Sequence, residues 1–181
     1  LDNNIFKIEK LIGRFIKNIT LIINNENILI LDIGLKKKNY EQIITKKFLE
    51  NSLLELKDLF NENYQDYKIM HMHIINYFFD QRRYPDFQID MNCENFRIEV
   101  QFISIPNKFI SEIDKILEKY QIKTINYLNQ NYLKNLFKQQ KIEISQMAYR
   151  SLLGYNTNEV LMIPKNVKKT GFFEKFFQLF S

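Results

Sequence analysis

The residues that decide the fold read Lys68-Ile-Met-His-Met-His-Ile-Ile-Asn-Tyr-Phe-Phe-Asp80 and, after a short interval, Asn95-Phe-Arg-Ile-Glu-Val-Gln-Phe-Ile-Ser-Ile105. In the second stretch apolar and polar side chains alternate, and the apolar ones are Phe96, Ile98, Val100 and Phe102. A period of two predicts a strand with one buried face. The interval 81–90 holds a proline and several aspartates, which are typical of turns, so we expect the two strands to pair antiparallel.

The residues before these two strands predict two helices and a further strand. Residues 5–22 predict a helix whose buried face is formed by Ile5, Ile8, Leu11, Ile12, Phe15, Ile16 and Ile19. Residues 28–34 form a short β-branched run and predict a buried strand, followed by a polar linker at 36–40. Thr45 is placed to cap a second helix that ends near Phe60 and buries Phe48, Leu49, Leu53, Leu56, Leu59 and Phe60.

Beyond the strand pair, Asn107 is expected to cap a third helix that buries Phe109, Ile110, Ile113, Ile116 and Leu117. Residues 121–128 predict a last strand, and residues 142–153 predict a helix that stops at Gly154. The fold class is therefore α+β, with a small antiparallel sheet, helices packed on one face and a C-terminal helical extension. We expect the domain at 1–128, the extension at 129–154, a linker at 155–170 and a terminal helix at 171–181.

Composition narrows the class of protein. The chain has 181 residues, 45% of them hydrophobic, with a net charge of +5. Its one cysteine, Cys93, excludes an internal disulfide framework. No run of residues is long and apolar enough to span a membrane. The positive charge favours an anionic partner, either nucleic acid or an acidic membrane surface.

The C-terminal segment favours the membrane. On a helix, apolar residues cover one face of 171–181, and lysines lie beside and before it. The expected membrane-binding residues are Lys168, Lys169, Phe172, Phe173, Lys175, Phe176, Phe177, Leu179 and Phe180. Such a helix sinks its apolar face to the acyl boundary while the lysines meet anionic headgroups, each contributing about 1 kcal/mol. The alternative is that the segment packs on its own domain or in a partner's groove.

Spacing within the first strand resembles a family signature. His71, Tyr77 and Asp80 match the pattern His-x-Ile-Pro-x-x-Tyr-x-x-Asp of the bacterial actin-like cell-division protein FtsA, in its strand-helix-strand-strand subdomain called 1C. Where the family has a glycine-rich loop before its next strand, Met91 remains, with Asp90 and Cys93 at the glycine positions. Val100-Gln-Phe-Ile-Ser104 resembles that next strand, and the terminal helix resembles the membrane-targeting helix that ends FtsA proteins.

The resemblance implies a non-catalytic adaptor at the division septum, on the cytoplasmic face of the cell membrane. Its partners would be other division proteins and further copies of itself, reached through contacts of the 1C-like domain. The stretch between the last matched strand and the terminal helix is too short for the family's nucleotide-binding lobes. ATP binding and docking to the Z-ring protein, which the family places there, are therefore not expected.

Other candidate sites have simpler interpretations. Leu31-Asp-Ile-Gly34 is similar to a phosphate loop, but lysines follow it instead of a hydroxyl residue. His71 and His73 lie two apart on a strand, which suits a metal, although a structural role is favoured for both. No nucleophile and base are spaced for catalysis, so we expect no enzyme activity, cofactor or metal. Arg82 and Arg83 suggest a solvated loop, and nucleic acid is not expected as a partner. The alternative function is a basic nucleic-acid-binding or other interaction domain with an aromatic docking tail.

Overall fold

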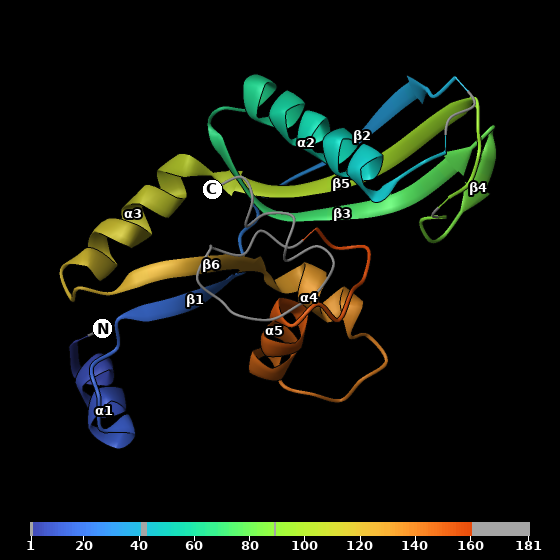
Figure 1. Cartoon of the computed structure of the whole chain (residues 1–181). Helices are drawn as coiled ribbons and strands as arrows, with labels where there is room; N and C mark the ends of the chain where they lie inside the picture. The colour runs from blue at the N-terminus through green and yellow to red at the C-terminus, as the bar shows by residue number, and fades with distance from the viewer. Residues whose placement is uncertain (1, 41–42, 89, 161–181) are drawn as a thin grey trace.

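The computed structural model describes residues 2–40, 43–88 and 90–160, and its class is α+β, as the sequence predicts (Figure 1). The elements in chain order are α1 (Asp2–Ile12), β1 (Asn18–Ile23), β2 (Leu29–Lys38), α2 (Lys46–Asn63), β3 (Tyr67–Phe79), β4 (Arg82–Tyr84), β5 (Asn95–Pro106), α3 (Asn107–Glu118), β6 (Lys123–Asn129), α4 (Gln130–Leu136) and α5 (Ile144–Leu152).

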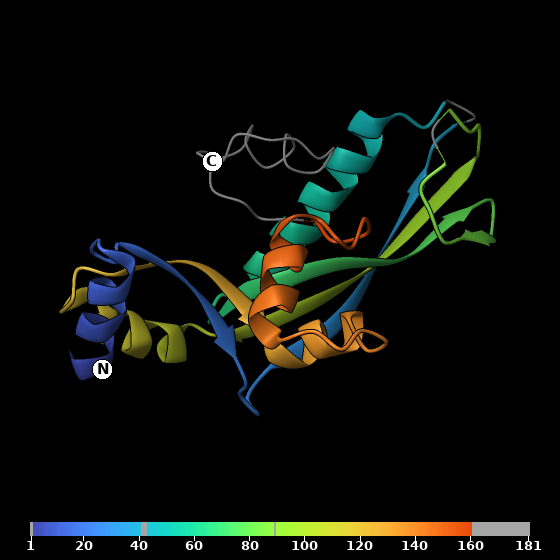
Figure 2. The same cartoon turned by 90° about the horizontal axis from the view of Figure 1, so that it is seen from below.

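The main sheet has four strands in the order β2-β5-β3-β4. The strands β3 and β5 are the two long stretches at its centre, and they pair antiparallel with Ile74 opposite Val100, which confirms the predicted pairing. The strand β2 pairs antiparallel with the other side of β5 and forms one edge of the sheet. In Figure 2 the long strands run away from α1 toward the short strand β4 at the far end.

The first hydrophobic core lies between α2 and one face of this sheet. The helix begins after Thr45, whose Oγ1 accepts the Phe48 N–H at 3.2 Å, so the predicted cap is confirmed. Buried residues of α2 pack against the side chains that the alternation of β5 placed on this face: Leu49, Leu53, Leu56 and Phe60 against Phe96, Ile98, Val100 and Phe102. Leu59 was expected in this core, but it is 42% exposed because it lies on the solvent side of α2.

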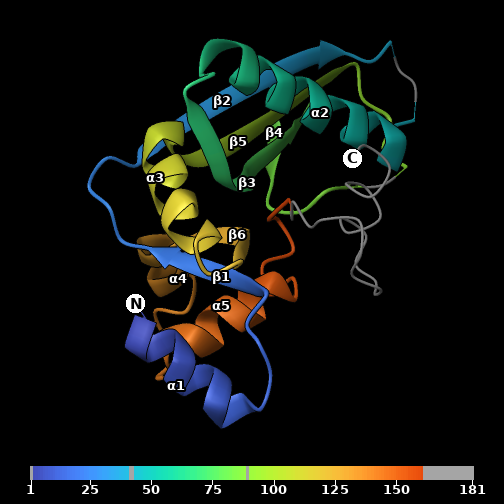
Figure 3. The same ribbon diagram turned by 90° about the vertical axis from the view of Figure 1, so that its left-hand side faces the viewer.

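A second core lies on the opposite face, near the other end of β5. The strands β1 and β6 pair parallel and form a separate two-stranded sheet below the main one (Figures 1 and 3). Ile103 and Ile105 of β5 enter this core together with residues of β1, β3, α3, β6, α4 and α5. Helices therefore lie on both faces of the main sheet: α2 covers one face, and α3, α4 and α5 pack on the other. The sequence analysis expected all helices on one face.

The predicted helix over residues 5–22 is wrong in its second half. The helix α1 ends at Ile12, and Gly13 then adopts a left-handed φ of 67°, which glycine tolerates better than other residues. Four of the six residues at 18–23 are β-branched, and this stretch forms β1 because β6 offers it a partner strand. The expected buried face is also wrong, since Ile8, Leu11, Ile12 and Phe15 are exposed.

The structure differs from three further expectations, which concern β2 and α3. The strand predicted at 28–34 continues through Lys38. Its side chains alternate between half-buried and exposed, whereas a buried strand was expected, because β2 lies at the edge of the sheet. Asn107 does not cap α3: Pro106 holds the cap position, and Asn107 Nδ2 donates to the carbonyl of Gln65 at 2.8 Å. Ile116 of α3 is 44% exposed, whereas Ile110 and Leu117 are buried as predicted.

The C-terminal part of the described chain joins the second core. The strand predicted at 121–128 and the helix predicted at 142–153 are present as β6 and α5, and Gly154 follows α5 with a φ of 81°. The short helix α4 lies between them and was not predicted. Residues 158–160 lie along the edge of β3, where Val160 N–H donates to the carbonyl of Met72 and Ile74 N–H to that of Asn158, both at 2.8 Å. This segment was expected to be part of a linker.

Candidate functional site

A polar cluster lies in the interior, around His71 of β3 and Glu159, which lies in the stretch after α5. His71 is 1% exposed and Glu159 is 4% exposed. Nδ1 of His71 lies 2.6 Å from Oε1 of Glu159, and the Asn129 N–H donates to Nε2 of the same ring at 2.8 Å. Oε2 of Glu159 accepts hydrogen bonds from the hydroxyls of Tyr132 at 2.9 Å and Ser151 at 3.3 Å. We call these five residues the His71–Glu159 clamp.

The hydrogen bonds of the clamp define the proton positions. Because Nε2 of His71 accepts an amide N–H, the neutral ring carries its proton on Nδ1 and donates it to Glu159. The carboxylate of Glu159 thus receives three donors, which compensates the cost of burying it. Burial, followed by the negative charge of Glu159, raises the pKa of Tyr132 well above its usual range, so this hydroxyl stays a donor.

Each member of the clamp comes from a different part of the chain. His71 is on β3, Asn129 ends β6, Tyr132 is on α4, and Ser151 is on α5. Local structure positions them further: Oδ1 of Asn129 caps α4 by accepting the Tyr132 N–H at 2.7 Å, and the His71 and Tyr132 rings lie 4.1 Å apart. The clamp therefore ties β6, α4, α5 and residues 156–160 to the main sheet.

The clamp has the residue types of a catalytic site but not the access. Both ring nitrogens of His71 are engaged, so neither is free to take a proton from a substrate. The Ser151 hydroxyl points to a carboxylate already shared with Tyr132, and the side chains are buried. The geometry therefore supports a structural role, in which the cluster orders the second core.

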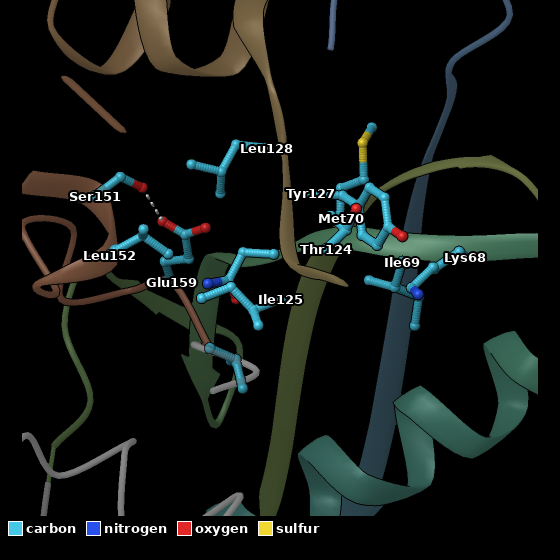
Figure 4. Close-up of a pocket in the computed structure, with 12 residues that line it drawn as sticks. Lys68, Ile69, Met70, Thr124, Ile125, Tyr127, Leu128, Ser151, Leu152 and Glu159 are labelled. Carbon is cyan, nitrogen blue, oxygen red and sulfur yellow. Dashed lines mark hydrogen bonds between the residues drawn. The ribbon is translucent and has the colours of Figure 1, made fainter. Parts of the chain in front are cut away.

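A cavity of about 190 Å³ opens beside the clamp, between β3, β6 and the end of α5 (Figure 4). Ser151 and Glu159 lie on one side of it, and Lys68 and Tyr127 on the other, with Lys68 Nζ 4.4 Å from the centre of the Tyr127 ring. Its described lining contains no histidine and no cysteine. The cavity thus offers a mixed surface, and the serine and carboxylate on its wall, Ser151 and Glu159, are already engaged with each other and with the rest of the clamp.

The structure does not place the two histidines together as metal ligands. His73 is half-buried beside Tyr132, with ring centres 6.2 Å apart, and burial lowers its pKa. Within residues 2–40, 43–88 and 90–160, no group of three or more His, Cys, Asp or Glu side chains lies close enough to hold a metal ion.

The residues that match the FtsA signature all stabilise the fold. His71 belongs to the clamp, and Tyr77 is 1% exposed and contacts the ring of Phe87 with centres 5.6 Å apart. Asp80 ends β3 with a left-handed φ of 46°, and its Oδ1 accepts the N–H groups of Glu94 and Asn95 at 2.9 and 2.8 Å. Met91 is half-buried against the first core.

Two other sequence features also lie in regular structure. Asp32 and Gly34 lie within β2, opposite Gln101 and Glu99 of β5, so this stretch does not form a phosphate-binding turn. Arg83 lies on β4, where its Nε donates to Oδ1 of Asn76 at 2.6 Å. Asp90, at a position where the family has glycine, adopts a left-handed φ of 62°, a conformation that Asp tolerates better than most residues.

The sequence predicts the helix α1 but not the exposure of its apolar residues. Its apolar residues and those just after it are among the most exposed in the described chain: Phe6 68%, Ile8 47%, Leu11 85%, Ile12 47% and Phe15 80%. The end of α1 is held by Glu9, whose Oε1 accepts the Ile16 N–H at 2.9 Å.

The expected membrane-binding residues 168–180 lie outside the described residues. No helix in the described part of the chain is both long and apolar enough to cross a bilayer.

Comparison with known proteins gives no further assignment: no protein-family model matches the chain, and no curated protein matches it. The class of the molecule therefore follows from its fold and surfaces. It is an α+β protein with a closed interior clamp and an exposed, apolar N-terminal helix.

Proposed function

We propose that this chain is a non-catalytic adaptor of the cell-division machinery that resembles FtsA and works at the cytoplasmic face of the cell membrane. The resemblance rests on His71, Tyr77 and Asp80, which match the signature in sequence. In the structure the same three residues hold β3 in place. The closed geometry of the clamp supports a role without catalysis. Such an adaptor acts by its location and by its contacts with other division proteins.

The observation that carries the proposal is the exposed apolar face of α1. The helix has 11 residues, and Ile5, Ile8, Leu11 and Ile12 follow one another at helical spacing along one side. Leu11 is 85% exposed, so most of its side chain lies in water. A large apolar surface on a folded protein marks an interaction site, because leaving it in water is costly.

Cations beside this face favour a lipid surface over an apolar protein groove. Lys7 and Lys10 lie on the adjoining side of α1, and Arg14 and Lys17 follow it in the chain. An interfacial helix buries its apolar side at the acyl boundary while its cations meet anionic headgroups. Glu9, which lies between the two lysines in the sequence, is occupied by the Ile16 N–H. Helix α1 thus has the chemistry expected of a membrane contact.

The C-terminal sequence adds a second contact to the proposal. Gly171–Ser181 carries five phenylalanines, and Lys168 and Lys169 precede it. Two short interfacial segments bind a bilayer much more tightly than either alone, because the second binds at high effective concentration. The proposal therefore assigns membrane attachment to α1 and the C-terminal segment together.

Co-sedimentation with vesicles tests the proposal. The full chain is compared with a Leu11→Ser/Phe15→Ser variant, a variant lacking residues 171–181, and a variant with both changes, on vesicles with and without anionic lipid. We expect binding that requires anionic lipid, weakens in each variant and is lost when both changes are combined. A Leu153→Ser variant is the matched control, since Leu153 is 65% exposed on another surface and its change should not affect binding.

Two results would contradict the proposal. Undiminished vesicle binding in the variant with both changes would exclude α1 and the C-terminal segment as the attachment. Tight, salt-sensitive binding to duplex DNA together with weak vesicle binding would instead favour a basic nucleic-acid-binding domain.

A further inference from the structure

The strand β2 presents a long open edge. It runs from Leu29 to Lys38, and in the described sheet it pairs with β5 on one side and with no strand on the other. The opposite side of the sheet is better covered, because β4 and residues 158–160 both pair with β3. An open edge exposes backbone N–H and C=O groups that are ready to pair with another strand.

Nothing in the described part of the chain explains Gly34, at the middle of β2. Its φ is not left-handed, and the register between β2 and β5 continues through it without a bulge. A Cβ placed on Gly34 would meet Cγ of Glu99 and the carbonyl of Ile98 at 3.9 Å, which is ordinary contact. Glycine weakens a strand, so pairing with β5 alone does not favour it at the middle of β2, and its exposed face leaves room for a partner's side chains.

We propose that two copies of this chain pair antiparallel through their β2 edges, with the twofold axis at Gly34. In that register each Asp32 lies opposite Lys36 of the other copy, and each Ile33 lies opposite Leu35. Directly opposite residues of an antiparallel pair lie on the same face, so these are cross-strand contacts. The result is one continuous sheet across both copies.

Charge and strand length together select this register over its neighbours. A twofold axis at Leu35 would keep an opposite-charge pair, Asp32 with Lys38, but it would pair only residues 32–38 of β2, whereas the axis at Gly34 pairs residues 30–38. A twofold axis at Ile33 pairs as many residues but puts Asp32 opposite Gly34, and it loses the opposite-charge pair. In the register about Gly34 the lysines at 36–38 of each copy lie beside the apolar beginning of the other β2, so the two runs of lysine do not meet. A parallel arrangement would bring them together.

The pairing is closed. A twofold interface uses the β2 edge of both copies, so no β2 edge remains for a third chain to join. The proposal is independent of the proposed membrane function, and it supplies a specific surface for self-association.

Charge reversal followed by sedimentation equilibrium tests the pairing. The full chain is expected to be a dimer, and Asp32→Lys should weaken dimerisation about tenfold or more, because two opposite-charge pairs become like-charge pairs. The double variant Asp32→Lys/Lys36→Asp should restore it. Far-ultraviolet circular dichroism checks that each variant keeps its fold, since Asp32 also accepts a hydrogen bond from Gln101. A Leu11→Ser/Phe15→Ser variant should remain dimeric, which separates this interface from α1.

Disulfide cross-linking tests the register in a Cys93→Ser background. Gly34→Cys should cross-link with itself, because the two positions are neighbours at the axis and the structure leaves room for a Cβ there. Ile30→Cys and Lys38→Cys should each fail to cross-link alone but should cross-link when the two variants are mixed. A monomeric full chain, a dimer unaffected by charge reversal, or self-linking at position 30 as fast as at position 34 would overturn the proposal.

Discussion

Removal of the Glu159 carboxylate should destabilise the whole protein. In Glu159→Ala the proton on His71 Nδ1 and the hydroxyls of Tyr132 and Ser151 lose their acceptor in a site where Glu159 is 4% exposed. A buried donor without an acceptor costs about 1–3 kcal/mol. The two hydroxyls can rotate, and the Tyr132 oxygen keeps the hydrogen bond that Asn156 donates at 3.0 Å, so the costs do not simply add. We expect a loss of about 3–5 kcal/mol in the free energy of unfolding, as for other broken buried pairs.

Urea unfolding with matched variants measures this loss. Glu159→Gln keeps the shape and one acceptor oxygen, so it should lose about 2 kcal/mol. Glu62→Ala is the control: Glu62 is exposed on α2, and the change should stay within about 0.5 kcal/mol.

Hydrogen exchange locates the effect within the fold. The amides of Ile74 and Val160, which bond between β3 and the 158–160 segment, should lose protection in Glu159→Ala, as should the amide of Asn129. A loss of stability below about 1 kcal/mol with unchanged protection of these amides would refute the structural role of the clamp.

Three further predictions concern other parts of the fold. Asp80→Ala removes the acceptor of two backbone N–H groups and should cost about 2 kcal/mol in urea unfolding, whereas Asp80→Gly should cost less because glycine tolerates the left-handed φ. Leu53→Ala, at a site that is 1% exposed, should cost about 2–5 kcal/mol, and Leu11→Ala, at a site that is 85% exposed, should stay within about 0.5 kcal/mol of the original stability. Burial, followed by the charge of Asp80, raises the pKa of the Cys93 thiol from 9.0 to about 11, so alkylation of Cys93 near pH 8 should be much slower in the folded protein than in urea. Because the folded state holds this proton more tightly, its contribution to stability is complete below about pH 9 and decreases as the pH rises through about 11; urea midpoints across that range should fall.

The centre of the fold can be predicted from sequence because its signals are local. The alternation from Phe96 to Phe102 is read within one strand, and Thr45 caps a helix three residues away. In both cases the residues that define the element also lie inside it or directly beside it. Local patterns alone therefore predict the central strand pair and α2 correctly.

The N-terminal region shows where local signals fail. Ile16 and Ile19 continue the helical spacing of α1, but they also belong to a β-branched run that suits a strand. The choice depends on β6, a strand about a hundred residues further along the chain, which pairs Ile19 with Thr124. Similarly, the lysines of β2 have no strand preference of their own, and they are extended because β5 pairs with them through Asn95.

The clamp is beyond sequence reasoning for the same reason. The spacing of His71 to Tyr77 and Asp80 marks the histidine, and a structural role is favoured for it. Glu159, however, follows Asn156-Thr-Asn158, a polar sequence typical of a loop, and it is 88 residues away from its partner. Nothing near Glu159 in the sequence marks it as buried, so only the folded chain reveals its partner.

Because residues 158–160 pair with β3, a gene fragment should have to extend through Val160 to yield folded protein. A shortened version that stops after α5, at Gly154, keeps every helix and strand of the described residues, yet it discards the acceptor for His71 and uncovers one side of β3. Such a product should be prone to proteolysis and to accumulation in inclusion bodies. Extending the same clone by six codons, to Val160, should be enough to recover soluble material.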